Sequence, residues 1–524
     1  MIRRACVRVD GRRVHYRWRG DGVPVVLLHA SPESSSAMSA QLNAYGKDHL
    51  AIALDTPGYG FSDPLPHAAP AMVDYANALA ATLDALGLPR VGLVGRHTGA
   101  AIAVEFARLN PDRVAGLICD GLPIYSAERR SDYLANYVAR NPPRWDGAHL
   151  IQAWFRFREQ HVYWPWFKQH PAARADTDLP TTQQLHRGCL NLLLSGETSG
   201  TAELAVFRYE MANALRQLRV PTLVATRDGD SLYRRMAMLK DLPDTISVKR
   251  LERGAGPLSD VERAALRPAL LSPPTPWPVQ PAHGPRLAPT FIDFRDGQVA
   301  ARVAGSRQRN HAILVLPDTP LGGALLEPAL EELGARHPVA CIDAPGSGDS
   351  SATMTADPLD GIVQAAEVVL TALSFKPDAI VGLGLGGFAA HRLATSLGLN
   401  PNADVVSLPT MTDETASAAV HDATLFADLS PDRHGLHLAR TWHQLRDHML
   451  WRPAGRGRRQ ARLDADMDTA ALHKRVIELM KNPANARPYL MAHAQATVAG
   501  PLPANPKATT RTAPIGQFLK AALS

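Results

Sequence analysis

A histidine stands in a segment whose neighbours are small enough for a sharp turn between a strand and a helix. The segment GRHTG (residues 95–99) follows an apolar run and places His97 at its centre. Imidazole titrates near neutral pH, so an exposed histidine at such a turn could accept or deliver a proton. Asp230, with Asp228 as the alternative, follows a later apolar run and could orient and charge-stabilise His97. The sequence thus predicts a proton-transfer site.

The elements that must position His97 are predicted from hydrophobic patterning. Strands are expected at Val25 to Leu28, Ala51 to Leu54, Val91 to Val94 and Val114 to Cys119, and helices at Met72 to Leu86 and Ala100 to Leu109. Apolar strands separated by helices indicate a parallel sheet with crossover connections. In such sheets chemistry lies at the carboxyl ends of the strands, which is where His97 falls.

The chain also repeats itself, with an offset of 287 or 288 residues. Four segments return in the same order: VVLLHASP (25–32) as ILVLPDTP (313–320), DTPGYGFS (55–62) as DAPGSGDS (343–350), GRHTG (95–99) as GLGLG (382–386), and GAHL (147–150) as GLHL (435–438). One register held over four separated segments predicts a tandem duplication.

The two copies are predicted to differ in completeness. We expect a first domain at 1–267 with a cap at about 125–215, a linker at 268–289 that holds eight prolines, a second domain at 290–500, and a tail at 501–524. The first domain has further strands at 220–228 and about 246–251, whereas no β-branched run follows at the equivalent place near 500. The second sheet would then have an open edge, which the first copy or a second subunit could cover in a homo-oligomer.

Together these segments resemble the α/β-hydrolase family. HASP (29–32) is similar to the family's HG-x-P loop, DTPGYGFS (55–62) to its D-x-P-G-x-G-x-S turn, and GRHTGA (95–100) to its nucleophile elbow. The resemblance covers nearly all of the first copy and most of the second. It implies two tandem α/β-hydrolase-like domains, each a mostly parallel sheet with helices on both faces and a helical cap, the second truncated. A dinucleotide-binding interpretation of GLGLGG (382–387) lacks the G-x-G-x-x-G spacing and a suitably placed acid.

Neither copy keeps a complete Ser-His-acid triad. The first elbow carries His97 within H-T-G-A, as in one branch of the family. Asp230 (or Asp228) matches the acid position, and Pro257 stands where the family has its histidine. The second elbow carries Gly384.

The resemblance still implies an oxyanion hole, made by the backbone amides of Ala30 and Thr98. An opposite hypothesis stays open, in which the elbow is degenerate and the imidazole of His97 only fills the volume of lost catalytic side chains.

Side chains near the elbow and in an aromatic-rich part of the cap could line an apolar pocket. The candidate substrate contacts are His29, Arg96, His149, Trp154, Arg158 and Trp164. The alternative is that these aromatics pack the cap onto the core. The second copy repeats three of the cap residues as His437, Trp442 and Arg446, which favours a structural role.

Composition excludes several classes of function. The 56 basic and 50 acidic residues leave a net charge of +6, too small an excess to indicate nucleic-acid binding. The four cysteines have no metal or CxxC spacing, and no apolar run approaches the roughly 18–20 residues of a membrane span. We expect a cytoplasmic protein that uses no metal or other cofactor and no membrane.

Ester or acyl hydrolysis of a small, partly apolar organic substrate is the activity that the resemblance implies. Two alternatives remain at this point: a catalytically inactive pseudo-hydrolase that binds a ligand or acts as a scaffold, and a lyase or isomerase on the same fold.

Overall fold

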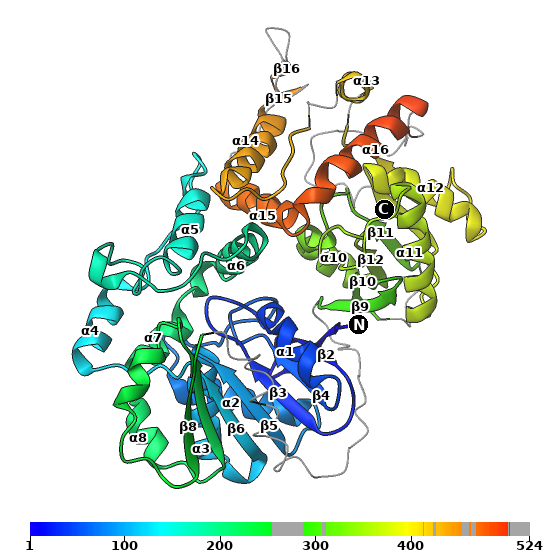
Figure 1. Cartoon of the computed structure of the whole chain (residues 1–524). Coiled ribbons are helices and arrows are strands. Elements are labelled where there is room, and N and C mark those ends of the chain that lie inside the picture. The colour runs from blue at the N-terminus through cyan, green and yellow to red at the C-terminus, as the bar shows by residue number, and fades with distance from the viewer. Residues whose placement is uncertain are drawn as a thin grey trace. The chain divides into compact units, whose positions relative to one another are not determined.

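The computed structural model describes residues 1–253, 262, 287–306, 311–411, 413–422, 426–452, 461–462, 468–500 and 502. The chain forms two compact units, each described by itself below (Figure 1). Unit 1 comprises Met1–Pro142 and Gln152–Ala282, and unit 2 comprises Pro143–Ile151 and His283–Ser524. Pro257, most of the predicted linker and nearly all of the predicted tail lie outside the described residues. Among the described helices, none combines the length and apolarity that crossing a bilayer demands.

Unit 1 is built on an eight-stranded sheet with the order β1-β2-β4-β3-β5-β6-β7-β8. Its strands are β1 (Arg3–Val9), β2 (Arg12–Arg19), β3 (Pro24–Leu28), β4 (Leu50–Leu54), β5 (Val91–Arg96), β6 (Val114–Asp120), β7 (Thr222–Arg227) and β8 (Ile246–Leu251). The β1–β2 hairpin and the β2–β4 pair are antiparallel, and every pair from β4 to β8 is parallel. All strands predicted for the first copy are present, and β5 lies in the interior of the sheet.

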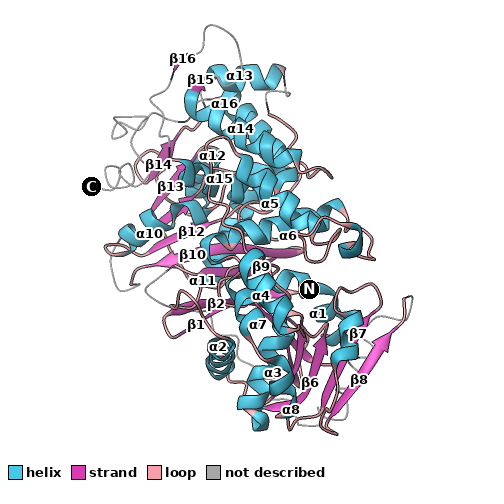
Figure 2. Ribbon diagram, turned by 90° about the vertical axis from the view of Figure 1, so that its left-hand side faces the viewer, coloured by secondary structure: helices cyan, strands magenta, loops and turns pink. Residues whose placement is uncertain are grey.

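Both faces of this sheet are buried, which explains the unbroken apolar runs. Along β3, Val25 and Leu27 join one hydrophobic cluster while Val26 and Leu28 join another, because successive side chains of a strand point to opposite faces. Helices cover both sides (Figure 2). The helices of this part of the chain are α1 (Ser39–Tyr45), α2 (Met72–Ala85), α3 (Thr98–Leu109), α4 (Ala127–Asn136), α5 (Ala148–Glu159), α6 (Thr182–Leu194), α7 (Thr201–Arg208) and α8 (Met211–Arg216), and the first residues of α5 belong to unit 2. Helices α4 to α8 lie between β6 and β7, where the cap is predicted.

Unit 2 contains a six-stranded sheet with the order β14-β13-β11-β12-β10-β9. Its strands are β9 (Pro289–Phe294), β10 (Gly297–Ala304), β11 (Ile313–Leu316), β12 (Val339–Ile342), β13 (Ala379–Leu383) and β14 (Val405–Leu408). Counted from β9, this order repeats that of β1 to β6 in unit 1. Within the described residues no strand corresponds to β7 or β8, so the second sheet is truncated as predicted.

The helices of unit 2 pack around this smaller sheet and extend beyond it (Figure 1). They are α10 (Glu327–Gly334), α11 (Pro358–Leu373), α12 (Leu385–Ser396), α13 (Asp413–His421), α14 (Leu436–Leu450), α15 (Thr469–Met480) and α16 (Ala486–Ala499), and β15 (Trp451–Arg452) pairs with β16 (Ala461–Arg462). Helix α16 contacts α11, α12 and α13. One feature differs from the predicted domain division: Pro143–Ile151, within the expected cap, belongs to unit 2.

Candidate active site

His97 occupies the turn between β5 and α3 in a backbone conformation that is uncommon for a residue with a side chain. Its φ is +47° and its ψ is −109°. Two glycines allow this turn, because a β-carbon at Gly95 would overlap the carbonyl of Gly99 and one at Gly99 would overlap the carbonyl of Leu28. Helix α3 therefore packs directly against β3 and β5, and the side chain of His97 is carried at the carboxyl edge of the sheet.

Asp230 binds the imidazole of His97. The distance from His97 Nε2 to Asp230 Oδ2 is 2.8 Å, and the backbone N–H of Leu232 donates to Asp230 Oδ1 at 2.8 Å. The side chains of His97 and Asp230 are 26% and 19% exposed. Since Asp230 accepts the Nε2 proton, the lone pair of the neutral ring lies on Nδ1, which has no hydrogen-bond partner among the described residues. The two ring nitrogens are thus used the opposite way round from the Ser-His-Asp template.

Each partner shifts the other toward its charged form. Burial disfavours the imidazolium, but the Asp230 carboxylate and its hydrogen bond outweigh burial, so the pKa of His97 lies above its ordinary value. Burial also disfavours the Asp230 carboxylate, but His97, the Leu232 amide and Arg96 together lower the pKa of Asp230 to about 2. Asp230 therefore stays ionised while His97 titrates.

Asp228, the alternative acid, lies elsewhere. Its Oδ2 is 3.5 Å from Nε of Arg253, and its side chain is 36% exposed. The structure thus brings Asp230 and not Asp228 to His97.

Arg96 lies beside His97 but is already paired. Its Nε is 2.8 Å from Oδ2 of the buried Asp120, and the attraction of Asp120 raises the pKa of Arg96. The pair adds one positive and one negative charge next to the imidazole. Nothing in this arrangement gives Arg96 a role in holding a substrate.

The two amides expected to form an oxyanion hole lie at neighbouring strand ends. Thr98 is the first residue of α3, Ala30 follows β3, and Leu28 of β3 is in register with Gly95 of β5. Neither amide has an acceptor among the described residues. Both donors are therefore available on the side of the sheet that carries His97.

His29 is an internal brace of this loop. Its side chain is fully buried, its Nε2 accepts the N–H of Thr56 at 3.0 Å, and its Nδ1 donates to the carbonyl of Ala30 at 2.9 Å. Burial lowers the pKa of His29, which keeps the ring neutral. With both nitrogens used, His29 holds Ala30 in place and is not available to a substrate.

His149 belongs to unit 2, unlike His97. Its Nδ1 accepts the N–H of Arg144 at 3.1 Å, and its Nε2 lies 3.0 Å from Nδ1 of His473. The ring meets Trp442 edge to face at 4.8 Å. In the repeated segment, Nδ1 of His437 accepts a backbone N–H in the same way. These contacts at the start of a helix favour the structural role over a substrate contact for His149.

The remaining cap candidates differ in how far they are buried. Trp154 is 3% exposed, Arg158 pairs with Glu159 at 2.9 Å, and Trp164 packs edge to face on Tyr137 at 5.9 Å. The packing interpretation therefore describes Trp154 best, while Arg158 and Trp164 remain partly exposed.

One residue of the site has no counterpart in the sequence-based prediction. Gly121, directly after β6, packs against the ring of His97 and leaves room for it. A glycine that follows a strand next to the elbow strand is the signal that could have indicated this position.

The elbow of unit 2 has the same backbone but no reactive side chain. Gly384 has φ +53° and ψ −123°, close to the values of His97. A β-carbon at Gly384 would overlap Oδ1 of Asp318, so the carboxylate already occupies the place of an elbow side chain.

The D-x-P-G turns of the two units share a buried aspartate with different partners. In unit 1, Asp55 accepts from His15 Nδ1 at 2.8 Å and from the Ser35 amide at 2.6 Å. In unit 2, Asp343 accepts from the Gly323 amide at 2.6 Å and from Arg302 Nη1 at 3.3 Å. The aspartate thus fixes the same turn in both units.

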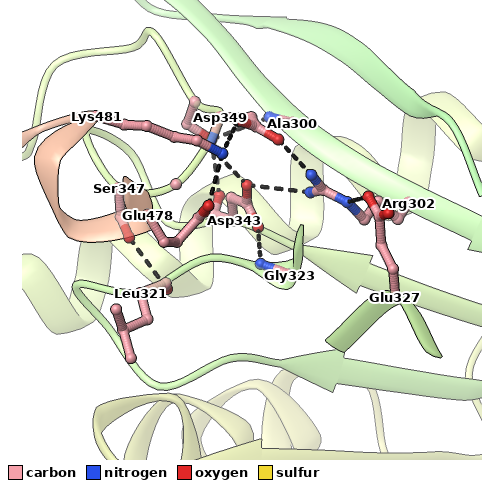
Figure 3. Close-up of polar contacts among 12 residues, drawn as sticks. Ala300, Arg302, Leu321, Gly323, Glu327, Asp343, Ser347, Asp349, Glu478 and Lys481 are labelled. Atoms are coloured by element: carbon pink, nitrogen blue, oxygen red, sulfur yellow. Dashed lines mark hydrogen bonds and ion pairs between the residues drawn. The ribbon is translucent and has the colours of Figure 1, made fainter. Parts of the chain in front are cut away.

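Unit 2 surrounds its aspartate with further buried charges (Figure 3). Arg302 also pairs with Asp349, and with Glu327 at 2.9 Å. Lys481, at the end of α15, lies 2.6 Å from both Asp349 Oδ1 and Glu478 Oε2. This charge cluster ties α15 to the loop after β12 and is structural.

Comparisons with known proteins agree with this architecture. A family model described as "alpha/beta hydrolase fold" matches residues 23–243. A haloalkane dehalogenase from Agrobacterium fabrum is 29% identical over 230 residues, which are 41% of this chain and 72% of that protein. The 2-hydroxy-6-oxononadienedioate/2-hydroxy-6-oxononatrienedioate hydrolase 1 of Dechloromonas aromatica is 36% identical over 114 residues, but these are 21% of this chain and only 39% of that relative.

Among solved structures, an esterase from Thermogutta terrifontis aligns with 51% of this chain and 99% of its own, at 22% identity and a TM-score of 0.39. The family assignment rests on the sequence matches and on the sheet order. Through residues 23–243 of unit 1, this chain belongs to the α/β-hydrolase fold family.

Proposed function

We propose that unit 1 is a cofactor-independent hydrolase of ester or related acyl bonds in a small, partly apolar organic substrate, with His97 as its general base. The observation that supports this most is the imidazole itself. Asp230 fixes it through Nε2 at 2.8 Å, and Nδ1 has no hydrogen-bond partner in the described part of the chain. The hydrolase relatives named above support hydrolysis as the reaction class.

The reaction needs no covalent intermediate. Nδ1 of His97 removes a proton from water as the oxygen attacks the acyl carbon, and Asp230 stabilises the imidazolium that forms. The amides of Ala30 and Thr98 donate to the carbonyl oxygen as it becomes negative. When the tetrahedral species collapses, the imidazolium returns its proton to the leaving alkoxide, which yields an acid and an alcohol.

The test is turnover of short and medium p-nitrophenyl acyl esters by the wild type and His97→Ala. We expect wild-type turnover that His97→Ala abolishes and that Asp230→Asn lowers by about 10²–10⁴-fold, the range for a lost acid–base function. Asp228→Asn is the matched control, because Asp228 contacts Arg253 instead, and its rate should equal that of the wild type. Equal rates in wild type and His97→Ala would overturn the proposal.

The absence of serine at the elbow favours one alternative. The Nδ1 of a histidine held by an aspartate can also transfer a proton in a lyase or isomerase reaction, which needs no attacking water. If no ester is turned over, this class and simple ligand binding by a pseudo-hydrolase become the leading accounts.

We also propose that the two units arose by tandem duplication and that unit 2 has no triad chemistry. The shared strand order, the similar elbow angles at His97 and Gly384, and the buried aspartate of each D-x-P-G turn support a common origin. Asp318 filling the elbow position supports the loss of function.

A further inference from the structure

A guanidinium group that pairs with no carboxylate of the described residues lies on the short helix that follows Asp230. Arg235 is half-buried on the 3₁₀ helix η5 (Tyr233–Met238), which begins just after Asp230. Its Cζ lies 4.8 Å from the ring centroid of Tyr125, and one Nη donates to Tyr133 Oη at 3.3 Å. Its Nε is buried and has no hydrogen-bond partner among the described residues, and no described carboxylate pairs with it.

Arg235 and the His97–Asp230 pair border the same segment of chain. Gly121 packs on the His97 ring, and Tyr125, a few residues later in the same connection, lies under the Arg235 guanidinium. Burial raises the pKa of Tyr125, while the charges of Arg235 and Asp230 act on it with opposite sign. The charges of Arg235 and Asp230 therefore both act on the phenol of Tyr125, in the connection that also carries Gly121.

Three other half-buried arginines of unit 1 have acidic partners, whereas Arg156 contacts Tyr137, Trp166 and Gln160. Arg96 pairs with Asp120 at 2.8 Å, Arg108 with Glu105 at 2.7 Å, and Arg113 with Asp84 at 2.7 Å. A partly desolvated cation costs free energy unless it is paired, and a tyrosine face compensates only part of that cost. The planar fork of an arginine matches a carboxylate with two parallel hydrogen bonds.

We propose that the ligand of the His97–Asp230 site carries a carboxylate, and that Arg235 binds it. The inference deepens the proposed hydrolase function and rests on its placement of the site. It narrows the substrate class to small acyl compounds with an anionic group at the end remote from the scissile bond. The alternative is that Arg235 only packs on Tyr125.

Binding is tested first, without turnover. Succinate and its neutral analogue succinamide are titrated in a thermal-shift assay with the wild type, Arg235→Gln and Arg234→Gln. Arg234 is the matched control, since it is the exposed neighbour on η5 and its change alters net charge equally. We expect succinate to raise the melting temperature of the wild type and of Arg234→Gln but not of Arg235→Gln, and succinamide to have no effect. A shift that persists in Arg235→Gln, or no shift in the wild type, would overturn the inference.

Arg235→Lys guards against a variant that does not fold. Lysine keeps the positive charge but lacks the planar guanidinium, so succinate should raise the melting temperature of this variant by less than that of the wild type. Equal increases with succinate and succinamide would count against the proposal.

Turnover then separates this inference from the proposed function. The substrates are 4-nitrophenyl hemisuccinate and its neutral methyl ester, which share one acyl chain. We expect Arg235→Gln to lose about 10–100-fold in kcat/KM on the anionic substrate and little on the neutral one, as for a lost hydrogen bond to a charged group. If His97→Ala is inactive while Arg235→Gln keeps the anionic preference, the hydrolase proposal stands and the carboxylate inference fails.

Discussion

Gly121 lies against the imidazole of His97: a β-carbon at position 121 would be only 2.5 Å from Nε2. The glycine also has φ +71°. The contact is on the nitrogen that binds Asp230, so the room left by Gly121 helps to decide which carboxylate His97 meets.

The substitution Gly121→Ala is therefore expected to displace the ring of His97 and to lower esterase turnover at least tenfold. The added methyl group should also cost about 1–3 kcal/mol of unfolding free energy through overpacking. Steady-state kinetics and chemical denaturation measure the two effects. Gly87→Ala is the control, because Gly87 has a similar φ of +67° but open space around its β-position. If both variants lose turnover equally, the contact with His97 is not the cause.

The activity should rise with pH through the pKa of His97. Only the neutral ring can accept a proton, and Asp230 holds that pKa above its ordinary value against the effect of burial. In Asp230→Asn the ring loses this stabilisation of its charged form, so the rise should move to lower pH while the maximum rate falls. An NMR titration of the His97 ring measures the pKa directly, and an unchanged value in Asp230→Asn would contradict the assignment.

The raised pKa of His97 also predicts that the folded state becomes less stable as pH rises. A histidine whose pKa is higher in the folded state stabilises the fold fully below its unfolded pKa, near 6.5, and loses that contribution as pH rises through the folded pKa. Thermal melts of unit 1 should therefore show a fall in stability above pH 6.5 that is absent in His97→Ala. A parallel fall in both proteins would assign it to other groups.

The buried ion pairs of Lys481 should contribute far more to the free energy of unfolding than an exposed ion pair does. Lys481→Met leaves the buried Asp349 and Glu478 without their common cation, and removing one partner of a buried pair costs about 3–5 kcal/mol. Arg392→Met is the matched control, because its pair with Asp360 is about half exposed and is worth at most about 1 kcal/mol. Denaturant titrations that give equal losses would show that the charge cluster is not structural.

Glu478 makes unit 2 sensitive to pH. Burial raises the pKa of Glu478 and the ion pair with Lys481 lowers it. The negative charges of Asp349 and Asp343 raise it further, and the resulting pKa is about 7. A carboxyl group with a raised folded pKa binds its proton more tightly in the folded state, so stability falls as pH rises from about 4.5 through 7. Glu478→Gln mimics the protonated acid and should remove this fall in melting temperature. A variant that follows the wild-type profile would exclude Glu478 as its source.

The architecture could be predicted from the amino-acid sequence, because patterns of side-chain size and hydrophobicity are local. Three local patterns carried this prediction: the apolar runs of β3 to β7, the small residues around His97, and the missing β-branched run near residue 500. The two units share one strand order, which agrees with the repeat seen in the sequence.

The contacts between side chains of distant segments could not be predicted, because they depend on how the whole chain packs. Asp228 and Asp230 both follow β7, and the sequence does not distinguish between them as partners of His97. The path of the loop directs Asp230 to His97 and Asp228 to Arg253. Likewise, His29 and His149 are residue types that often act in catalytic sites. Their ring nitrogens, however, form hydrogen bonds with backbone groups and with His473. Distances between segments far apart in the chain depend on packing, and hydrogen bonds form only at short range, so residue type alone could not assign these roles.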